Sequence, residues 1–502
     1  MDNSPVTGKP AVATSDKGLQ SGAIGLLGSV VFGVASVAPG YSLAATIGLI
    51  AGVVGLASPF IMFAAFIPML LVASGFYYMN RADPDCGETF IWTARAFGPQ
   101  IGWVIGFTAV AASVIVMANL AQIAAQYMFY FFGLNSLGDS TFWCTFGGVC
   151  WIIFVTIFVA IGIKMSEKVQ YVLMILQIVP LVLFTIWAIV KAVATHPAGY
   201  APIKLSWFFT THLSGNQLAA GVTLAVFLYW GWDSVTAINE ESENSNTMPG
   251  VSAVLNTLVL VLLYVMVTVA MQMYHGAEFL SKNSGDVFAP IAKDVMGSPW
   301  DKLVLLCVFT SAAASALTTL LPLTRQTLSM AAHKSLPKIF GEIHPKYLTP
   351  FKGTIILSVL SILWYVMLTW VNVNLLYDAI AALGIMICLA YGGTGLAATV
   401  YYRKELFKSW KNFLLIGLAP TVGAVLFALV LVKVISDDLT PSNSYATVFG
   451  IGGTLLMGIG VVVLGIILMI VMWIARPEFF RRRPETWPGE GMPIPYADER
   501  VE

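Results

Sequence analysis

The chain has 502 residues, of which 58% are hydrophobic and only 10% are charged, and its formal net charge is zero. A soluble domain carries about 25% charged residues, so this composition excludes a soluble globular protein. The balanced charge also argues against a nucleic-acid partner and against a basic protein held on a membrane surface. We therefore expect a chain that lies within a bilayer.

Long apolar segments follow one another along the whole chain. A spanning helix needs about 20 apolar residues, and these runs are continuous rather than alternating, which excludes a β-barrel. We expect an all-α polytopic membrane protein with twelve transmembrane helices. Their approximate ranges are 22–52, 58–80, 100–132, 142–163, 169–192, 214–238, 251–274, 300–331, 353–371, 375–401, 412–435 and 446–475.

The basic residues predict the orientation. Residues 1–20 are polar and precede an apolar run too long for the core of a signal peptide, so we expect an uncleaved tail there. Cytoplasmic loops carry an excess of Lys and Arg. With both tails in the cytoplasm, the 26 Lys and Arg fall inside with six exceptions, which are Lys191, Lys204, Lys282, Lys293, Lys302 and Lys433. We expect a multi-pass protein of the cell membrane with cytoplasmic termini.

The first span contains a Pro-Gly pair well inside its apolar run. Proline removes a backbone donor and clashes with the preceding turn, and glycine relaxes the chain further. We expect either a broken helix or a simple kink here. If the helix is broken, the candidate substrate-binding residues are Ser36, Val37, Ala38, Pro39, Gly40, Tyr41 and Ser42.

Asn119 is the polar residue of the third span that we expect to face a cavity. The chain has no cysteine–histidine spacing typical of zinc. It also lacks the short motifs of nucleotide-driven transport and of hydrolysis. We therefore expect no catalytic residue, no metal site and no organic cofactor.

The sixth span contains a carboxylate, Asp233, beside Gly231. A charge near the bilayer centre costs roughly 3 kcal/mol, so such a residue faces a cavity or a partner. We expect a second helix break here. Its candidate binding residues are Tyr229, Trp230, Gly231, Trp232, Asp233 and Ser234. Two alternatives remain, namely aromatic residues that only pack and a structural Asp233 bound by backbone N–H groups away from substrate.

The two interruptions occupy matching places five spans apart, which indicates an inverted repeat with a binding site at its interface. Broken helices free backbone N–H and C=O groups, and in a membrane these groups must line a cavity. The amino-terminal end of a half-helix favours an anion and the carboxy-terminal end favours a cation. Such a site suits an amino acid or a small amine.

Three sequence segments resemble one transporter family. Residues 229–249 contain Tyr-Trp-Gly-Trp-Asp-Ser, an Asn-Glu-Glu stretch and a proline, and residues 325–350 contain Arg, Met-Ala, Leu-Pro, His-Pro and Thr-Pro. Residues 96–103 read Ala-Phe-Gly-Pro before Gly-Trp. Together these segments resemble the amino acid–polyamine–organocation (APC) superfamily, and the resemblance covers about residues 20 to 475.

The resemblance implies a LeuT-like 5+5 inverted repeat in which helices 1 and 6 are broken. Substrate would lie between them, with spans 3, 8 and 10 around it. A cytoplasmic amino-terminal tail (1–20) would precede the transporter core (21–402). Two peripheral spans (403–475) and a cytoplasmic carboxy-terminal tail (476–502) would follow.

The coupling ion stays open between Na⁺, H⁺ and none. Some proton-coupled members carry a lysine in span five where Gln177 stands here, and a neutral glutamine cannot replace that cation. Sodium-coupled relatives use carbonyls of span one and hydroxyls of span eight. The coupling-ion candidates are therefore Asp233, Gln177, Thr310, Ser311 and Ser315.

Two departures from the family concern substrate and gating. The first break reads Ser-Val-Ala-Pro-Gly, which is similar to putrescine importers and gives weight to an amine substrate. The loop after span six is purely acidic, and Glu240 and Glu241 are candidates to pair with Arg325 or Lys334 as an inner gate. A solvated acidic face is the alternative.

We therefore expect a secondary transporter that imports an amino acid, amine or polyamine by alternating access, with ion coupling. An uncoupled facilitator or obligate exchanger of the same substrates is the alternative, and a substrate sensor is a third. The expected partners are the small-molecule substrate and the bilayer, without nucleic acid, and the protein would be a monomer or a homodimer.

Overall fold

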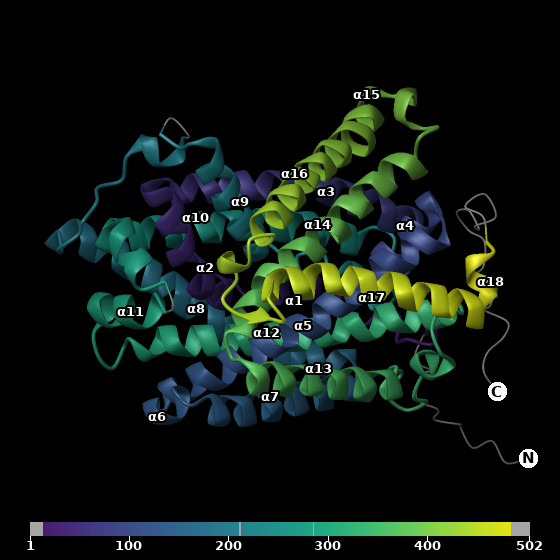
Figure 1. Cartoon of the computed structure of the whole chain (residues 1–502), viewed down its shortest axis with the longest axis horizontal. Coiled ribbons are helices and arrows are strands. Elements are labelled where there is room, and N and C mark those ends of the chain that lie inside the picture. The colour runs from purple at the N-terminus through teal and green to yellow at the C-terminus, as the bar shows by residue number, and fades with distance from the viewer. Residues whose placement is uncertain (1–13, 210–211, 285, 483–502) are drawn as a thin grey trace, which may run out of the picture.

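The computed structural model describes residues 14–209, 212–284 and 286–482, and nearly all of them are helical (Figure 1). The long helices are α1 (Leu26–Ser36) with α2 (Pro39–Val54), α3 (Ser58–Ala82), α5 (Pro99–Phe131), α7 (Thr141–Ile161), α8 (Ile163–Thr195), α9 (Gly215–Leu228), α10 (Met248–Lys282), α12 (Lys302–Ala332), α13 (Phe351–Val371), α14 (Leu375–Tyr401), α16 (Ala419–Asp438) and α17 (Gly453–Ala475).

Short elements connect the long helices. The short α-helices are α4 (Thr89–Phe97), α6 (Asn135–Gly138), α11 (Phe288–Met296), α15 (Trp410–Asn412) and α18 (Pro477–Phe480). The 3₁₀ turns are η1 (Gly55–Ala57), η2 (Leu205–Phe208), η3 (Thr236–Glu241), η4 (Lys338–Gly341), η5 (Leu406–Lys408) and η7 (Pro441–Asn443), and η6 (Phe413–Leu418) is a π-helical turn before α16. Two-residue strands β1 (Thr447–Val448) and β2 (Ile451–Gly452) pair antiparallel before α17.

Ten helical segments among the described residues are long and apolar enough to cross a membrane. The first of them, Leu26–Ala82, holds two expected spans on either side of η1, and the sixth span is shorter because α9 stops at Leu228. Dividing that segment and adding α9 accounts for the twelve expected spans. The all-α polytopic class and the broken first and sixth spans are confirmed.

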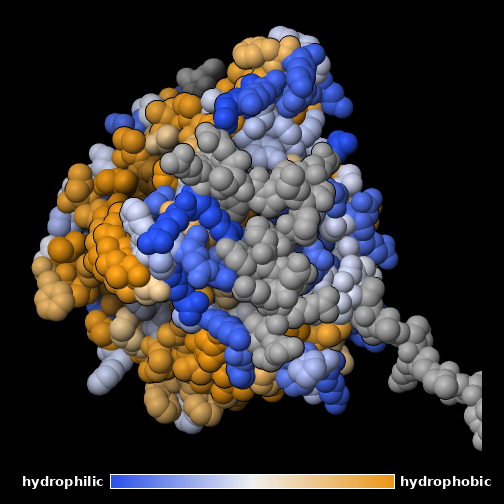
Figure 2. All heavy atoms as spheres, turned by 90° about the vertical axis from the view of Figure 1, so that its right-hand side faces the viewer, coloured by the Kyte–Doolittle hydropathy of each residue, from blue (hydrophilic) through white to orange (hydrophobic). Residues whose placement is uncertain are grey.

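The helices lie side by side as one bundle (Figure 1). α4 and α18 mark one end, called the α4 end below, and α6 and α11 mark the opposite end. Figure 2 looks at the α4 end, where hydrophilic residues gather towards the middle and hydrophobic residues form much of the rim. A polar end face with an apolar circumference is the surface that a bilayer requires.

α12 is the central helix of the bundle, since every residue from Thr310 to Met330 is buried. It packs extensively on α5, and α10 packs extensively on α3. These pairs join span eight to span three and span seven to span two, positions five spans apart, as an inverted repeat arranges them. Small residues such as Ala312, Ala313 and Ala314 allow this close approach of helices.

The described part of the amino-terminal segment is not a free tail. Leu19 is fully buried, Thr14 and Gln20 form an antiparallel bridge, and Ile24 pairs with Ser242 after η3. Residues 1–13 and 483–502 of the two expected tails lie outside the described residues. The boundary between a core (21–402) and peripheral spans (403–475) stays a prediction.

Candidate functional site

The first helix break lies between α1 and α2. α1 ends at Ser36, Ala38 adopts a left-handed conformation with φ of 51°, and α2 begins at Pro39. Proline is well accommodated at the first position of a helix, because its missing N–H has no partner there in any case. The break therefore precedes Pro39 rather than following from a proline inside a helix.

Gly40 has a different role from the expected one. We expected it to loosen the chain, but it is helical, and a Cβ there would lie 2.8 Å from the Sγ of Cys307 and 3.2 Å from the Cβ of Ser311. The physical reason for glycine at this position is the close approach of α2 to α12. The residue that departs from helical geometry at this break is Ala38, and not Gly40 as expected.

Hydroxyls of α12 satisfy the backbone groups that the first break frees. Ser315 Oγ donates to the carbonyl oxygen of Ser36 at 2.6 Å. Ser311 Oγ accepts from the N–H of Gly40 at 3.1 Å and from that of Tyr41 at 3.4 Å. The ends of both half-helices thus have partners within the protein, as buried backbone groups in a membrane require.

The second helix break occupies residues 229–235 between α9 and η3. Gly231 adopts φ of 108°, a conformation that glycine reaches without strain. A Cβ at Gly231 would lie 3.2 Å from the backbone C and O of Ser36, so the two breaks meet here. The segment beyond the break is only the six-residue 3₁₀ turn η3, shorter than the helical continuation that the apolar run predicts.

Side chains of α10 satisfy the carbonyl oxygens of the second break. Tyr264 Oη donates to the carbonyl oxygen of Leu228 at 2.5 Å, and Asn256 Nδ2 donates to that of Trp232 at 3.2 Å. Asn256 also fills the space beside Gly33 of α1, where any Cβ would collide with it. α10 therefore supports both broken spans.

Tyr391 of α14 holds the charged residue of the second break. Its hydroxyl donates to Asp233 Oδ1 at 2.5 Å and accepts from the N–H of Gly231 at 3.1 Å. The Asp233 side chain is 9% exposed and has no cation beside it among the described residues. The Tyr391 hydroxyl thus orients the Asp233 carboxylate and also binds the backbone of the break at Gly231.

Both breaks border a cavity with a volume of about 70 Å³. One water molecule needs roughly 10–15 Å³, so the cavity holds several waters or one small solute. Its wall comes from both breaks, the start of α4, and α5, α12 and α14. The predicted site residues that line it are Ser36, Val37, Ala38, Tyr41, Ser42, Trp230, Gly231, Asp233, Ser234 and Ser315.

Two predicted aromatic residues point away from the cavity. Tyr229 Oη donates to the carbonyl oxygen of Met62 on α3 at 2.9 Å. Trp232 is fully buried, with its ring centroid 5.0 Å from that of Phe76. Of the three aromatic side chains in this break, Trp230 is the one that lines the cavity, and the packing alternative applies to the other two.

Asn119 does not line the cavity; it is buried within the bundle, at 3% exposed. Residues of an α-helix that share a face recur every three or four positions. The stripe of α5 that lines the cavity passes to one side of Asn119 and consists of Ala109, Ala112, Ser113, Val116 and Leu120. Pro39 and Gly40 are likewise set back from the wall.

The structure adds lining residues that the sequence did not single out. Glu88, the residue before α4, is 2% exposed and accepts hydrogen bonds from Gln326 Nε2 at 2.5 Å and from the hydroxyl of Thr236. Glu88 lies in the connection between α3 and α4, and burial together with the Asp233 carboxylate raises its pKa well above the ordinary value. A carboxylate in a short loop carries no sequence signal that separates it from a solvated one.

The predicted coupling-ion residues are divided between two places. Asp233 and Ser315 line the cavity, whereas Ser311, Thr310 and Gln177 are not part of its wall. The hydroxyl of Thr310 bonds back to carbonyl oxygens of its own helix. Gln177 is fully buried on α8, and its carbonyl oxygen accepts from a cysteine thiol of α12 at 3.0 Å.

The predicted gate residues belong to a buried ionic network at the α4 end. Arg325 forms a two-pronged pair with Glu241, at 2.8 and 3.0 Å, and both side chains are fully buried. Glu240 pairs instead with Lys17, at 2.5 Å. Lys334 contacts Glu478 rather than the acidic loop. The alternative of a solvated acidic face does not hold for Glu241.

Lys17 joins three separate segments in this network. Its ammonium lies 3.0 Å from Asp85 Oδ2 and 2.5 Å from Glu240 Oε1, and Asp85 also contacts His333 at 2.9 Å. Burial alone would lower the pKa of Lys17, but the Asp85 and Glu240 carboxylates hold it well above the ordinary value. Lys17 also keeps the pKa of Asp85 well below its ordinary value despite burial.

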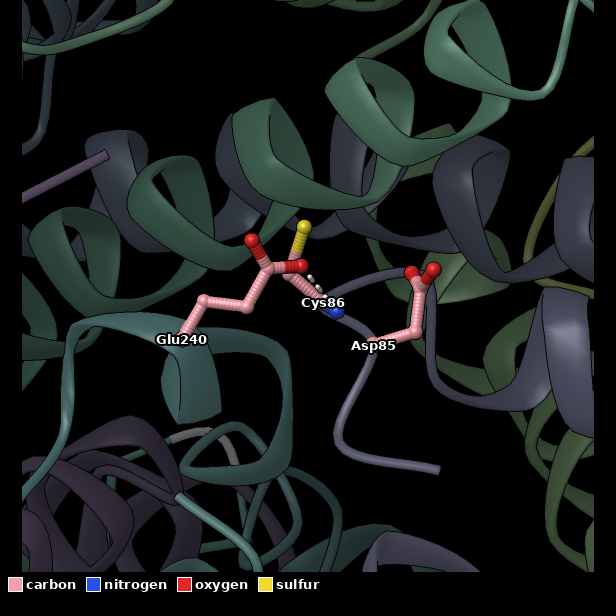
Figure 3. A group of neighbouring side chains, drawn as sticks. All are labelled: Asp85, Cys86 and Glu240. Carbon is pink, nitrogen blue, oxygen red and sulfur yellow. Dashed lines mark hydrogen bonds between the residues drawn. The ribbon is translucent and has the colours of Figure 1, made fainter. Parts of the chain in front are cut away.

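Figure 3 shows Asp85, Cys86 and Glu240 converging from the connection after α3 and from η3. Their ligand atoms lie within 4.8 Å of one another, an arrangement that a metal ion can use. Here the Lys17 ammonium already supplies the positive charge to both carboxylates. The backbone N–H of Cys86 also donates to Glu240 Oε1 at 3.1 Å.

Comparison with known proteins decides the family. The model of the amino acid permease family matches residues 20–456. The chain belongs to the amino acid permease family. It is therefore a multi-pass membrane transporter and not an enzyme, and its matched region includes both helix breaks and every residue of the cavity wall.

Several curated permeases are similar to this one. It is 20% identical over 399 residues, 79% of this chain and 85% of the relative, to the low-affinity putrescine importer PlaP of Escherichia coli. It is 24% identical over 357 residues, 66% and 70% of the two chains, to the arginine/ornithine antiporter ArcD2 of Lactococcus lactis. It is 26% identical over 316 residues, 60% of this chain, to the vacuolar cationic amino acid transporter 4 of Arabidopsis thaliana, half of which is covered.

Proposed function

We propose that this permease is a secondary transporter that imports a small amine through the cavity between its two helix breaks. One observation carries the proposal: the cavity wall contains the carboxylates of Asp233 and Glu88 and no Lys, Arg or His, and every residue of that wall is described. Unpaired buried charges are costly. A cationic solute offsets this cost, whereas an additional carboxylate would increase it.

The first break supports an amine over an α-amino acid. In a helix break, free N–H groups at the start of the second half-helix are the natural site for a substrate carboxylate. Here the N–H groups of Gly40 and Tyr41 are already bonded to Ser311. Three of the similar permeases support a cationic substrate, namely a putrescine importer, a cationic amino acid transporter and an arginine/ornithine antiporter.

We propose that the α4 end faces the cytoplasm in the cell membrane. Lys and Arg are concentrated in the segments at that end, which is the bias of cytoplasmic loops. The network of Lys17, Asp85, Glu240, Glu241 and Arg325 then closes the cytoplasmic side of the cavity. Opening requires these pairs to separate and their charged groups to be solvated, so the substrate must bind the open state more tightly than the closed one.

The coupling mode stays open between two ions and obligate exchange. Asp233 is the candidate to exchange a proton for a cationic substrate, and Ser311 and Ser315 with the Ser36 carbonyl are the candidates for Na⁺. Obligate exchange is the second candidate mode, favoured by the antiporter among the relatives. The experiment below separates these modes by the gradients it imposes.

Uptake into proteoliposomes tests the function. Purified permease is first screened by thermal shift against amines, polyamines and amino acids, because a ligand at 100 times its Kd stabilises by about 2.7 kcal/mol. Radiolabelled hits are then assayed with a proton gradient, a sodium gradient, or unlabelled amine inside. We expect amine stabilisation and uptake driven by one ion gradient. Stabilisation by neutral amino acids but not amines would contradict the amine proposal.

Thiol labelling of Cys86 tests the closure. Cys86 is fully buried beside Glu240, and burial raises the pKa of its thiol well above the ordinary value, so it should react slowly in the closed state. In a Cys150→Ser background, which removes an exposed thiol, Lys17→Ala should accelerate labelling of Cys86 about tenfold or more. The matched control is Lys334→Ala at the same end. Equal labelling rates in both variants would contradict a closing role for Lys17.

A further inference from the structure

The cavity contains a second group of polar residues that the helix breaks do not explain. Glu88 and Gln326 lie in its wall, on the loop before α4 and on α12, and neither belongs to a broken span. Both are more than nine-tenths buried, at 2% and 8% exposed. The question is what a buried carboxylate and amide hold there.

The hydrogen bonds assign the free atom of this pair. Gln326 Nε2 donates to Glu88 Oε1 at 2.5 Å, so the amide nitrogen of Gln326 already has its partner in the carboxyl group. The amide oxygen is therefore the remaining atom, and this buried Oε1 has no hydrogen-bond partner among the described residues. The Gln326 amide oxygen and the Glu88 carboxyl group thus lie beside each other in the cavity wall. Together they would accept hydrogen bonds from a positively charged donor.

The backbone conformation of Glu88 indicates that the surrounding structure holds this residue in place. Its φ is 35°, in the region that favours glycine and in which a long side chain is strained. Strain of this kind persists where surrounding structure holds the residue, and it clusters at functional sites. The side chain is held on its other oxygen by the hydroxyl of Thr236, which also lies 2.8 Å from the carbonyl oxygen of Asp233.

Charge accounting separates this group from the site at Asp233. Cations on the adjoining elements already have partners, since Arg325 pairs with Glu241 and Lys17 pairs with Asp85. One ammonium group at Asp233 would leave the Glu88 carboxyl group without a cationic partner. A solute with two ammonium groups satisfies both carboxylates and the orphan oxygen of Gln326.

We propose that Glu88 and Gln326 form a second ammonium subsite, which makes the permease selective for diamines over monoamines. This inference rests on the proposed amine transport and adds to it the number of charges on the substrate. Asp233 accepts one ammonium at the helix break, and Glu88 with the Gln326 amide oxygen accepts the other towards α4. Unpartnered hydroxyls of Tyr41 and Ser234 line the same cavity and are available to further polar groups.

Equilibrium binding of an amine series tests the subsite. Purified full-length permease is titrated calorimetrically with unbranched diamines of three to six carbons and with the monoamine of each length. We expect the preferred diamine to bind at least ~10-fold more tightly than its monoamine. Glu88→Gln should remove that preference by weakening the diamine ~10- to 100-fold, the range for losing a hydrogen bond to a charged group, while the monoamine of the same length loses clearly less affinity than the diamine.

Two further variants keep the test independent of folding. Glu88→Gly removes the carboxylate and suits the positive φ, so it should fold at least as well and show the same loss of preference. Glu278→Gln is the charge-matched control, because Glu278 is exposed at 82% and pairs with the neighbouring Lys282. The control should bind both amines as the unmodified permease does.

The outcomes are distinguishable. Equal weakening of monoamine and diamine in both Glu88 variants would show a structural role and overturn the subsite. An unchanged diamine preference, with an altered pH dependence alone, would make Glu88 a proton site and also overturn it. An unmodified permease that binds neither amine class would overturn the proposed function itself, whereas equal binding of both classes would overturn only the subsite.

Discussion

The two helix breaks of this permease solve the same problem with different chemistry. At the first break the freed backbone groups are closed by serine hydroxyls, with Ser315 on the Ser36 carbonyl and Ser311 on two N–H groups. At the second break they are closed by aromatic and amide side chains, and a carboxylate, Asp233, is held by Tyr391. The first break is neutral and the second is charged.

This difference divides the work of the site. A neutral break whose N–H groups are occupied forms an uncharged wall that hydroxyls of α12 hold in place. A charged break attracts a cation and needs a donor to orient its carboxylate. We infer that recognition resides mainly in the second break and that the first shapes the cavity, and four substitutions test this division, from the largest expected effect to the smallest.

Gly231→Leu should abolish binding and transport. The position has φ of 108° and a Cβ there would meet the backbone of Ser36 at 3.2 Å, so the variant strains the turn and separates the two breaks. The strain alone is on the order of 1–3 kcal/mol. Gly460→Leu in α17 is the matched control, since a Cβ at Gly460 meets nothing within 4 Å. Uptake assays compare the two, and residual uptake above a tenth would argue against a rigid break.

Asp233→Asn should lower uptake about 100-fold while the protein stays folded, because a buried charged partner of the substrate is typically worth about 2–5 kcal/mol. The control is Asp378→Asn. Asp378 is also buried, at 0% exposed against 9% for Asp233, but it accepts from the N–H groups of Tyr445 and Ala446 and holds the turn before α17. Asp378→Asn should lower the melting temperature, and it should reduce the uptake rate far less than Asp233→Asn does. Near-normal uptake by Asp233→Asn would remove this carboxylate from recognition.

Tyr391→Phe should weaken amine binding about tenfold, since a hydrogen bond to a charged group contributes about 1.5–3 kcal/mol and water can replace part of it. Tyr229→Phe is the control from the same break, because its hydroxyl bonds to Met62 on α3 and lies away from the cavity. Calorimetry measures both. Equal losses in the two variants would mean that the phenol acts through packing and not through Asp233.

Ser315→Ala should have the smallest effect on amine binding, about twofold, yet it should lower the free energy of unfolding by roughly 1–3 kcal/mol because the Ser36 carbonyl loses its donor. Ser361→Ala is the control, since that hydroxyl donates to a carbonyl oxygen of its own helix. Thermal melts and uptake in sodium and choline buffers compare them. A loss of sodium dependence confined to Ser315→Ala would assign the first break a coupling role.

The sequence was sufficient to place the breaks but not to assign the roles of neighbouring side chains. Gly231 and Asp233 stand out because a charge and a helix-breaking residue in an apolar run are costly in a bilayer. Trp230 and Trp232 are indistinguishable on that ground, and only packing against α3 separates the buried Trp232 from the cavity-lining Trp230.

The acidic loop gives the same lesson at the α4 end. The sequence proposes Glu240, Glu241 and Arg325 as a group, and the structure pairs Glu241 with Arg325. The partner of Glu240 is Lys17, which stands 223 positions earlier in a segment expected to be a polar tail. No local pattern predicts such a pair, because it depends on how the amino-terminal segment folds over the bundle.

By itself the sequence determined the membrane class, the number of spans and the two broken helices, since these follow from solvation, which acts on each residue where it stands in the chain. The tertiary structure alone decided which side chains face the cavity, that Glu88 and Gln326 join Asp233 there, and that hydroxyls of α12 close the first break. Those choices depend on the rotation and approach of helices distant in sequence, and a hydrophobic run carries no record of them.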